Sequence, residues 1–235
     1  HAQVLLDRDA PTYITPYARM FVAAAQQLPA LMNAYRTGGG VNWRDYGADM
    51  SEGQEWGNRP TYVNSMADWL ASIEDLHARL SAGARVADVG CGGGLVSEPL
   101  ARMGARVVGL DPGRENVEAA RAHVEGQTGS GGLDLTYRVG MVEELAAEGL
   151  QFDAVVSLEV VEHVPDVGAF VKTCASLVRP GGALVLSTIN RNLKSYALAI
   201  VAAEYVLGWL PRGTHQWDRF VTPEELARFV TAAGM

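Results

Sequence analysis

Short apolar runs alternate with amphipathic helical patterns along residues 84–188. Five runs have the length of buried strands: Arg85–Val89, Arg106–Leu110, Leu135–Val139, Ala154–Leu158 and Ala183–Thr188. The segments between them show helical spacing: Ser97–Met103, Glu115–Val124, Val142–Ala147 and Val167–Leu177. Strands that alternate with helices are typical of a parallel sheet with right-handed crossovers. We therefore expect an α/β fold with a doubly wound, mostly parallel sheet.

Residues 1–82 lack this alternation and predict a helical, loop-rich segment. Apolar spacing predicts one helix over Ala18–Tyr35 and another over Thr61–Leu80, the latter with Met66, Leu70, Ile73 and Leu76 near one face. Between them, Gly38–Gly40 breaks the pattern, and Val41–Pro60 predicts irregular structure. Two domains follow, a lead-in of residues 1–82 and a ligand-binding domain of residues 83–235.

Two further helices are predicted at Ser195–Leu207 and Pro223–Ala233. The first is rich in apolar residues and carries few charges. Its composition fits a hydrophobic lid, an interfacial helix that touches lipid, or a core helix packed on the sheet.

Composition narrows the class of protein. The 235 residues suit one α/β domain with an accessory segment, and 48% hydrophobic with 20% charged residues argues against global disorder. A net charge of -8 argues against a nucleic-acid partner. The only two cysteines, Cys91 and Cys174, are far apart in the chain, which favours a reducing cytoplasm over a disulfide scaffold. There is no apolar run of about 18 residues that would predict a membrane-spanning helix.

The glycine-rich loop after the first strand is the strongest candidate for a ligand site. Gly90, Gly92 and Gly94 lie two residues apart, and glycine lets a backbone turn tightly and approach a ligand closely. The alternative is a tight strand-to-helix turn without a ligand. Asp111 ends the second strand, where a carboxylate can accept bonds from the ribose hydroxyls of an adenosine cofactor. It could instead cap a helix, since Pro112 follows it.

The spacing of this loop bears on which cofactor binds. Position 95 is Leu95, so the third glycine of a dinucleotide-binding Gly-x-Gly-x-x-Gly pattern counted from Gly90 is missing. A neutral loop followed by an acidic strand end suits a sulfonium nucleoside, which has no phosphate to neutralise. We therefore expect S-adenosylmethionine rather than a nicotinamide cofactor.

A second candidate site, Glu159, Glu162 and His163, follows the fourth strand, at the sheet edge where α/β folds bind ligands. If a helical turn starts at Glu159, the three side chains share one side and could hold a magnesium ion. Such an ion could bind both oxygens of a catechol and lower the pKa of the reacting hydroxyl. Alternatively, the two glutamates solvate the loop while His163 caps it, or His163 acts as a general base.

Residues 84–235 resemble the ubiquinone-biosynthesis O-methyltransferases, which methylate catechol-type hydroxyls on polyprenylated quinone precursors. The resemblance rests on six stretches: Asp88–Pro99, Gly109–Pro112, Ser157–Val164, Leu177–Gly182, Ser187–Tyr196 and Gly213–Phe220. The last three stretches, together with the second candidate site of Glu159, Glu162 and His163, are far more specific to this family than the glycine loop.

This resemblance implies a Rossmann-like class I methyltransferase fold and a lipophilic phenol as substrate. It implies S-adenosylmethionine binding by a set of six residues: Asp88, Gly90, Gly92, Gly94, Asp111 and Leu158. Glu159, Glu162 and His163 match the family's magnesium-linked triad and become the expected catalytic residues. The predicted helix Ser195–Leu207 matches a segment associated in the family with membrane lipid, so we expect a cytoplasmic protein with peripheral membrane contact through residues 193–210.

Two departures from the family leave other functions open. Its lead-in, which carries a cofactor-binding arginine, is not found in residues 1–82. Ala18–Ala34 and Gly38–Pro60 resemble instead the lead-in of actinobacterial-type methyltransferases with an N-terminal winged helix, which favours a small phenolic or other natural-product acceptor. The family fold also ends with two further strands. Met235 falls before the position of these strands, so we expect them to be missing from this chain. A truncated, non-catalytic cofactor-binding module is therefore the third hypothesis.

Overall fold

The computed structural model describes residues 1–71, 75–125, 132–197, 200–201 and 216–235. Within these ranges the chain forms two compact units. The sheet unit comprises Ser65–Thr188 and Pro223–Met235, and the helical unit comprises His1–Asn64 and Ile189–Thr222. Each unit is described by itself below.

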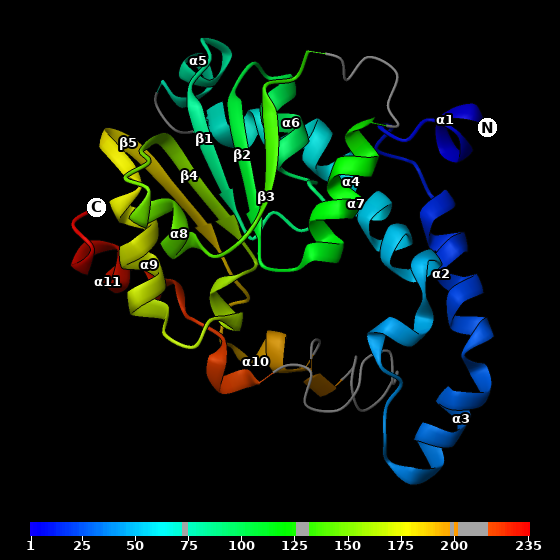
Figure 1. Ribbon diagram of the computed structural model, residues 1–235. Helices are drawn as coiled ribbons and strands as arrows, with labels where there is room; N and C mark the ends of the chain where they lie inside the picture. The colour runs from blue at the N-terminus through cyan, green and yellow to red at the C-terminus, as the bar shows by residue number, and fades with distance from the viewer. Residues whose placement is uncertain (72–74, 126–131, 198–199, 202–215) are drawn as a thin grey trace. The chain divides into compact units, whose positions relative to one another are not determined.

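The sheet unit contains a five-stranded parallel sheet. Its strands are β1 (Arg85–Val89), β2 (Arg106–Asp111), β3 (Leu135–Val139), β4 (Phe152–Leu158) and β5 (Val178–Ser187). Their order in the sheet is β3-β2-β1-β4-β5, and all pairs are parallel (Figure 1). The chain builds outward from β1 to β3 and then returns to the other side of β1, so the order reverses between β1 and β4. This confirms the predicted α/β fold and locates its topological switch point.

Helices flank this sheet, as the alternating pattern predicts. They are α5 (Leu76–Ser81), α6 (Ser97–Arg102), α7 (Arg114–Glu125), α8 (Val142–Ala147), α9 (Val167–Ser176), α11 (Pro223–Ala232) and the short 3₁₀ helix η2 (Val161–His163). Helices α6 and α7 pack on β2 and β3, whereas α9 packs on β5, α8 and α11 (Figure 1). Helices cover the sheet, so the central strands β1 and β4 are almost entirely buried and read in sequence as continuous apolar runs.

Strand β5 is longer than the sequence predicts. It begins at Val178 instead of the predicted Ala183, so the stretch Arg179–Gly182 lies inside the strand. The pairing with β4 absorbs this stretch through a register shift near Phe152 and Ala154. Arg179 also donates to the Asp153 carboxylate at 2.9 Å, which holds the irregular part of β5 on its neighbour.

The helical unit carries the remaining elements. They are α1 (Ala2–Leu5), α2 (Thr15–Gln26), α3 (Leu28–Thr37), η1 (Trp43–Tyr46), α4 (Ala48–Ala71, whose last residues belong to the sheet unit), α10 (Leu193–Ser195) and η4 (Trp217–Arg219). Ala23, Val41, Tyr46 and Met50 form a buried cluster in this unit. The single helix predicted over Ala18–Tyr35 is divided between α2 and α3. Pro29 lies in the first turn of α3 and has no amide hydrogen with which α2 could continue.

The prediction of irregular structure over Val41–Pro60 is wrong from Ala48 onward, because α4 begins there and passes through Pro60. Contacts distant in sequence offset the helix-breaking tendency of this stretch. The Trp56 ring packs against the guanidinium groups of Arg8 and Arg19, at 4.3 and 4.9 Å from the ring centre.

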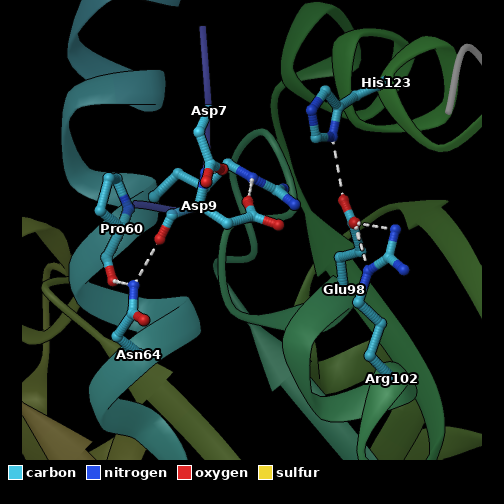
Figure 2. A network of polar contacts seen from close by, with 8 residues as sticks. Asp7, Asp9, Pro60, Asn64, Glu98, Arg102 and His123 are labelled. Carbon is cyan, nitrogen blue, oxygen red and sulfur yellow. Dashed lines mark hydrogen bonds and ion pairs between the residues drawn. The ribbon is translucent and has the colours of Figure 1, made fainter. Parts of the chain in front are cut away.

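Asn64 forms a further contact that holds this part of α4 in place. Its side-chain amide donates to the carbonyl oxygens of Pro60 and Asp9, at 2.7 and 2.6 Å (Figure 2). The helix predicted over Thr61–Leu80 is interrupted, since α4 ends at Ala71 and α5 begins at Leu76. Met66, Leu70 and Leu76 of its predicted apolar face are buried, whereas Ile73 lies outside the described residues.

The helix predicted over Ser195–Leu207 is described only in part. Residues 193–197 and 200–201 are helical, and the rest of the segment lies outside the described residues. Leu193, Tyr196 and Val201 are exposed. Within the described part of the chain, no helix has the length and apolar character needed to cross a membrane.

Candidate functional site

The glycine loop is anchored to the end of β2. The backbone amides of Gly90 and Cys91 both donate to the carbonyl oxygen of Leu110, at 2.7 and 3.0 Å. The amide of Gly92 donates to Oδ2 of Asp111 at 3.0 Å. Main-chain and side-chain contacts therefore join the two features that the sequence predicts to bind the cofactor.

Two of the three glycines are required by close packing. Gly90 and Gly94 have left-handed backbone angles, with φ of 79° and 86°. A Cβ atom at Gly90 would collide with the Val160 side chain, and one at Gly94 would collide with the Tyr137 hydroxyl. Gly92 differs, because a Cβ atom there would meet no atom within 4 Å. The loop is thus packed on two sides and open at its middle.

Asp111 combines the two roles that the sequence leaves open. Its Oδ1 accepts from the Gly113 amide at 2.8 Å and from the Asn116 side chain at 3.0 Å, which braces the turn into α7. Its Oδ2 accepts from Gly92, and the residue is 7% exposed. A carboxylate has about four lone-pair positions, so these three bonds leave room for about one more donor. Ribose binding by Asp111 stays a prediction.

Asp88 lies at the back of the loop and is 2% exposed. The Ser97 hydroxyl donates to its Oδ2 at 2.6 Å, which fixes the start of α6. Burial raises the pKa of Asp88 from 3.8 to about 6, against the lowering effect of the Ser97 hydrogen bond, and the negative charge of Asp111 raises it further. Asp88 therefore supports the loop with a carboxylate that titrates close to neutral pH.

Tyr137 on β3 is a site residue that the sequence analysis missed. It is 5% exposed and packs with Cys91, Val117 and Ala120 beneath the loop. Among the described side chains, its hydroxyl is the buried group without a hydrogen-bond partner, and burial raises its pKa so that the phenol stays neutral. The available sequence signal was that both Gly94 and Gly109 are glycines, since a Cβ atom at either would collide with Tyr137.

The acidic loop follows β4 at the same edge of the sheet. Leu158 is the last residue of β4 and is partly exposed. Glu159 is exposed and has a left-handed backbone with φ of 57°, which is uncommon for a residue other than glycine. Glu162 lies in η2 and is 5% exposed, whereas His163 is exposed.

The assumption that a helical turn starts at Glu159 is wrong. The turn begins at Val161, and the left-handed backbone of Glu159 sets it apart from Glu162 and His163. Each carboxylate instead accepts from a hydroxyl, Glu159 from Ser187 and Glu162 from Thr188. In the residues that the structure describes, no three His, Cys, Asp or Glu side chains gather in a way that could hold a metal ion. The three residues therefore do not fit a preformed magnesium site.

A buried ion-pair network ties the helices that follow β1 and β2. Glu98 of α6 is 1% exposed. Its carboxylate lies 2.7 Å from Arg102 and 3.0 Å from Nδ1 of His123 on α7 (Figure 2). Because the Glu98 amide also donates to the Gly94 carbonyl, this network supports the far end of the glycine loop.

The carboxyl ends of β1, β2 and β4 bring these parts together. The glycine loop, Asp111 and the acidic loop all leave the sheet at one edge, beside the switch point between β1 and β4. Ligands of open α/β sheets bind in the crevice at this position. The contact between Gly90 and Val160 joins the glycine loop directly to the acidic loop.

Comparisons with known proteins agree with this arrangement. Residues 62–235 match the family model of a methyltransferase domain. A ubiquinone biosynthesis O-methyltransferase of Methylobacterium sp. (strain 4-46) is 56% identical over 177 residues, which are 75% of this chain and 70% of that protein. The protein of the same name from Methylocella silvestris is 55% identical over 153 residues, 65% of this chain and 58% of that protein. The chain thus matches between 58% and 70% of the length of these relatives.

Solved structures confirm the fold. An O-methyltransferase family protein from Burkholderia thailandensis matches with a TM-score of 0.66 and 17% identity, over 100% of this chain and 70% of that one. Magnesium protoporphyrin IX methyltransferase from Synechocystis PCC 6803, solved with bound SAH, matches with a TM-score of 0.56 and 24% identity, over 87% of this chain and 83% of that one. With the family match and the close relatives, this confirms the resemblance inferred from the sequence: the chain belongs to the S-adenosylmethionine-dependent methyltransferases and, among them, to the family of the ubiquinone biosynthesis O-methyltransferases.

Proposed function

We propose that the chain transfers a methyl group from S-adenosylmethionine to a catechol-type hydroxyl of a polyprenylated phenol. The observation that carries this proposal is the direct packing of the glycine loop on the acidic loop at Gly90 and Val160. A methyl donor held by the first loop then lies beside carboxylates on the second. The identity to the ubiquinone biosynthesis enzymes supports the choice of a prenylated phenol.

In this reaction S-adenosylmethionine supplies a methyl group activated by its positively charged sulfur. The phenol oxygen forms the new O–C bond while the C–S bond breaks, and the electron pair of that bond stays on sulfur. The protein mainly contributes orientation and a place for the phenol proton. We assign the cofactor contacts to Asp88, Gly90, Gly92, Gly94, Asp111 and Leu158.

Glu162 is the residue we assign to accept the phenol proton. It lies at the carboxyl edge, and burial keeps its carboxylate from being fully hydrated. Exposed His163 is its neighbour in η2 and can pass the proton to solvent, and Glu159 on the same loop is exposed as well. A buried base beside the reacting hydroxyl is the arrangement that general-base catalysis needs.

Magnesium dependence stays a prediction of the family resemblance. The hydroxyls of Ser187 and Thr188 hold Glu159 and Glu162 separately, each through one carboxylate oxygen, so the reaction proposed here uses Glu162 as a base. The two alternatives differ in one measurement, the rate of methyl transfer after treatment with a chelator and after adding magnesium back. A rate that persists without added metal supports the base, and a rate that disappears and returns with magnesium supports the triad.

A peripheral membrane contact through residues 193–210 belongs to the same proposal. The exposed side chains of Leu193, Tyr196 and Val201 support it, because apolar groups at the start of this segment are available to lipid. Co-sedimentation with lipid vesicles measures the contact. Leu193→Glu is expected to weaken it without changing methyl transfer to a water-soluble phenol.

The decisive experiment is mass spectrometry of acceptors after incubation with methyl-labelled S-adenosylmethionine. A prenylated catechol is compared with the same catechol lacking its prenyl chain. We expect a labelled methyl ether mainly on the prenylated compound. Absence of a methylated product from every phenol would overturn the proposal.

A small phenolic acceptor is the second candidate. The observation that favours it is that the family match begins at residue 62, so most of the helical lead-in lies outside it. Equal or faster methylation of the unprenylated catechol would establish this alternative.

A further inference from the structure

Two adjacent residues, Ser187 and Thr188, each donate a side-chain hydrogen bond to a different carboxylate of the acidic loop. The Ser187 hydroxyl donates to Oε1 of Glu159 at 2.6 Å, and the Thr188 hydroxyl donates to Oε2 of Glu162 at 2.9 Å. Neither hydroxyl has a role in the reaction as described so far. Each nevertheless contacts a group at the centre of that reaction.

The register of the sheet explains this pairing. Strands β4 and β5 are parallel neighbours, with Leu158 opposite Ser187, so the loop after β4 begins beside the end of β5. Successive side chains of an extended chain point to opposite faces. Ser187 and Thr188 are therefore suited to reach two different carboxylates rather than the same one.

Ser187 holds Glu159 through both its main chain and its side chain. Its carbonyl oxygen accepts from the Glu159 amide at 3.1 Å, in addition to the hydroxyl contact with the carboxylate. Glu159 has an uncommon left-handed backbone, and such conformations persist where the surrounding contacts fix them. Ser187 thereby fixes the point at which the acidic loop leaves the sheet.

Thr188 acts on the more buried of the two carboxylates. Glu162 is 5% exposed, and a buried carboxylate needs hydrogen bonds to stay in one position. The Thr188 hydroxyl engages Oε2, which leaves the lone pairs of Oε1 for a proton of the acceptor. The hydroxyl thus selects the oxygen of Glu162 that can act as the base.

We propose that Ser187 and Thr188 are positioning residues for methyl transfer, which orient Glu159 and Glu162 toward the hydroxyl of a phenolic acceptor. The inference rests on the proposed function, because it concerns the orientation of the carboxylates toward the acceptor hydroxyl. It does not concern the binding of the methyl donor. Orientation of a reacting pair contributes strongly to rate, and small displacements reduce it.

The first test compares Thr188→Val and Ser187→Ala with the unaltered chain. We expect kcat for the prenylated catechol to fall about tenfold or more, as expected for a misplaced base. The dissociation constant of S-adenosylmethionine, measured by calorimetry, should stay within about twofold of the unaltered value. Thr188→Ser keeps the hydroxyl and should retain most of kcat.

Thr173→Val is the matched control for loss of a threonine hydroxyl. Thr173 lies on α9 and donates to the Ala169 carbonyl at 2.9 Å, within its own helix. This variant should leave kcat unchanged. If Thr188→Val does not fold, as judged by circular dichroism, Thr188→Ser and Ser187→Ala still test the inference through their kcat values.

A double-mutant cycle tests whether Thr188 acts through Glu162. Adding Thr188→Val to Glu162→Gln should cause no further loss of kcat, because the group that Thr188 orients is already changed. Independent, multiplying losses would overturn the inference, as would full activity of Thr188→Val or a parallel loss of donor affinity. An unaltered chain that methylates no phenol would instead overturn the proposed function itself.

Discussion

Gly90 packs directly against Val160, with no space between them for a Cβ atom. This contact joins the loop expected to hold the methyl donor to the loop that carries Glu159 and Glu162. We therefore expect the relative placement of donor and acceptor to depend on this contact between one glycine and one branched side chain.

Gly90→Ala is expected to destabilise the sheet unit and to weaken S-adenosylmethionine binding. The substitution forces a left-handed backbone on alanine, at about 1–2 kcal/mol, and overpacks the contact with Val160, at about 1–3 kcal/mol. Urea unfolding and calorimetry measure the two effects. Adding Val160→Ala to Gly90→Ala should recover only the stability lost through overpacking. A double variant no more stable than Gly90→Ala would show that the Val160 side chain is not what the added Cβ atom meets.

The raised pKa of Asp88 leads to a prediction of how the stability of the fold depends on pH. Its pKa in the folded protein, about 6, lies above the ordinary value of 3.8, so the folded state binds the proton more tightly. The free energy of unfolding should therefore fall as the pH rises from about 4 to about 6, by up to about 3 kcal/mol. Asp88→Asn should remove this dependence and raise the melting temperature at pH 7.5 more than at pH 4.

The ionisation of Asp88 should also make the binding of S-adenosylmethionine depend on pH. S-adenosylmethionine carries a positive sulfur, so it should bind the ionised form of Asp88 better than the neutral form. Affinity should therefore rise between pH 5 and pH 7, and Asp88→Asn should flatten this rise. Calorimetric titrations at several pH values provide the measurement, and a pH-independent affinity in the unaltered chain would contradict the prediction.

Asp111→Ala is expected to weaken S-adenosylmethionine binding about tenfold or more, because charged hydrogen bonds are worth about 1.5–3 kcal/mol. The variant also loses the contacts with Gly92, Gly113 and Asn116, so stability should fall as well.

Asp166→Ala separates these two effects of Asp111→Ala. Asp166 caps α9 by accepting from the Ala169 amide at 2.9 Å. Its replacement should cost about 1 kcal/mol of stability and leave donor affinity unchanged. Unaltered donor affinity in Asp111→Ala would refute the ribose assignment.

Tyr137→Phe should leave stability unchanged or raise it slightly. The hydroxyl is buried without a partner, so its removal relieves a desolvation penalty and loses no hydrogen bond. Tyr137→Leu should instead cost about 2 kcal/mol or more, since the ring fills the space under Gly94 and Gly109. Thermal unfolding of the two variants distinguishes a packing role from a polar one.

The parallel sheet could be predicted because its signals are local. Central strands such as β1 and β4 are buried on both faces and appear in sequence as short apolar runs between helices. The position of Asp111 at the end of β2 and of the glycine loop after β1 follows from the same pattern. The carboxyl edge of a parallel sheet then places these residues together before any contact is known.

Other features could not be predicted because they depend on contacts between residues distant in sequence. Helix α4 continues through Pro60 because Trp56 and Asn64 contact residues from the first 19 positions. The backbone of Glu159 and its bond to Ser187, 28 residues later, leave no local pattern. The spacing of Glu159, Glu162 and His163 therefore indicated three side chains on one helical turn. In the structure, the two carboxylates are held separately.

The sheet unit is assembled from two separate pieces of chain, and this sets the order in which it can form. Residues 189–222 interrupt it as an insertion, and α11 returns to pack on α9, where Phe229 covers Gly168. Closing a loop of this length opposes that return by about 3 kcal/mol of chain entropy. During synthesis, the βα repeats from β1 to β5 leave the ribosome before α11 and can pair before α11 reaches α9. Helix α11 can therefore dock only after residues 189–222 have been made, and until then the surface of α9 around Gly168 stays uncovered.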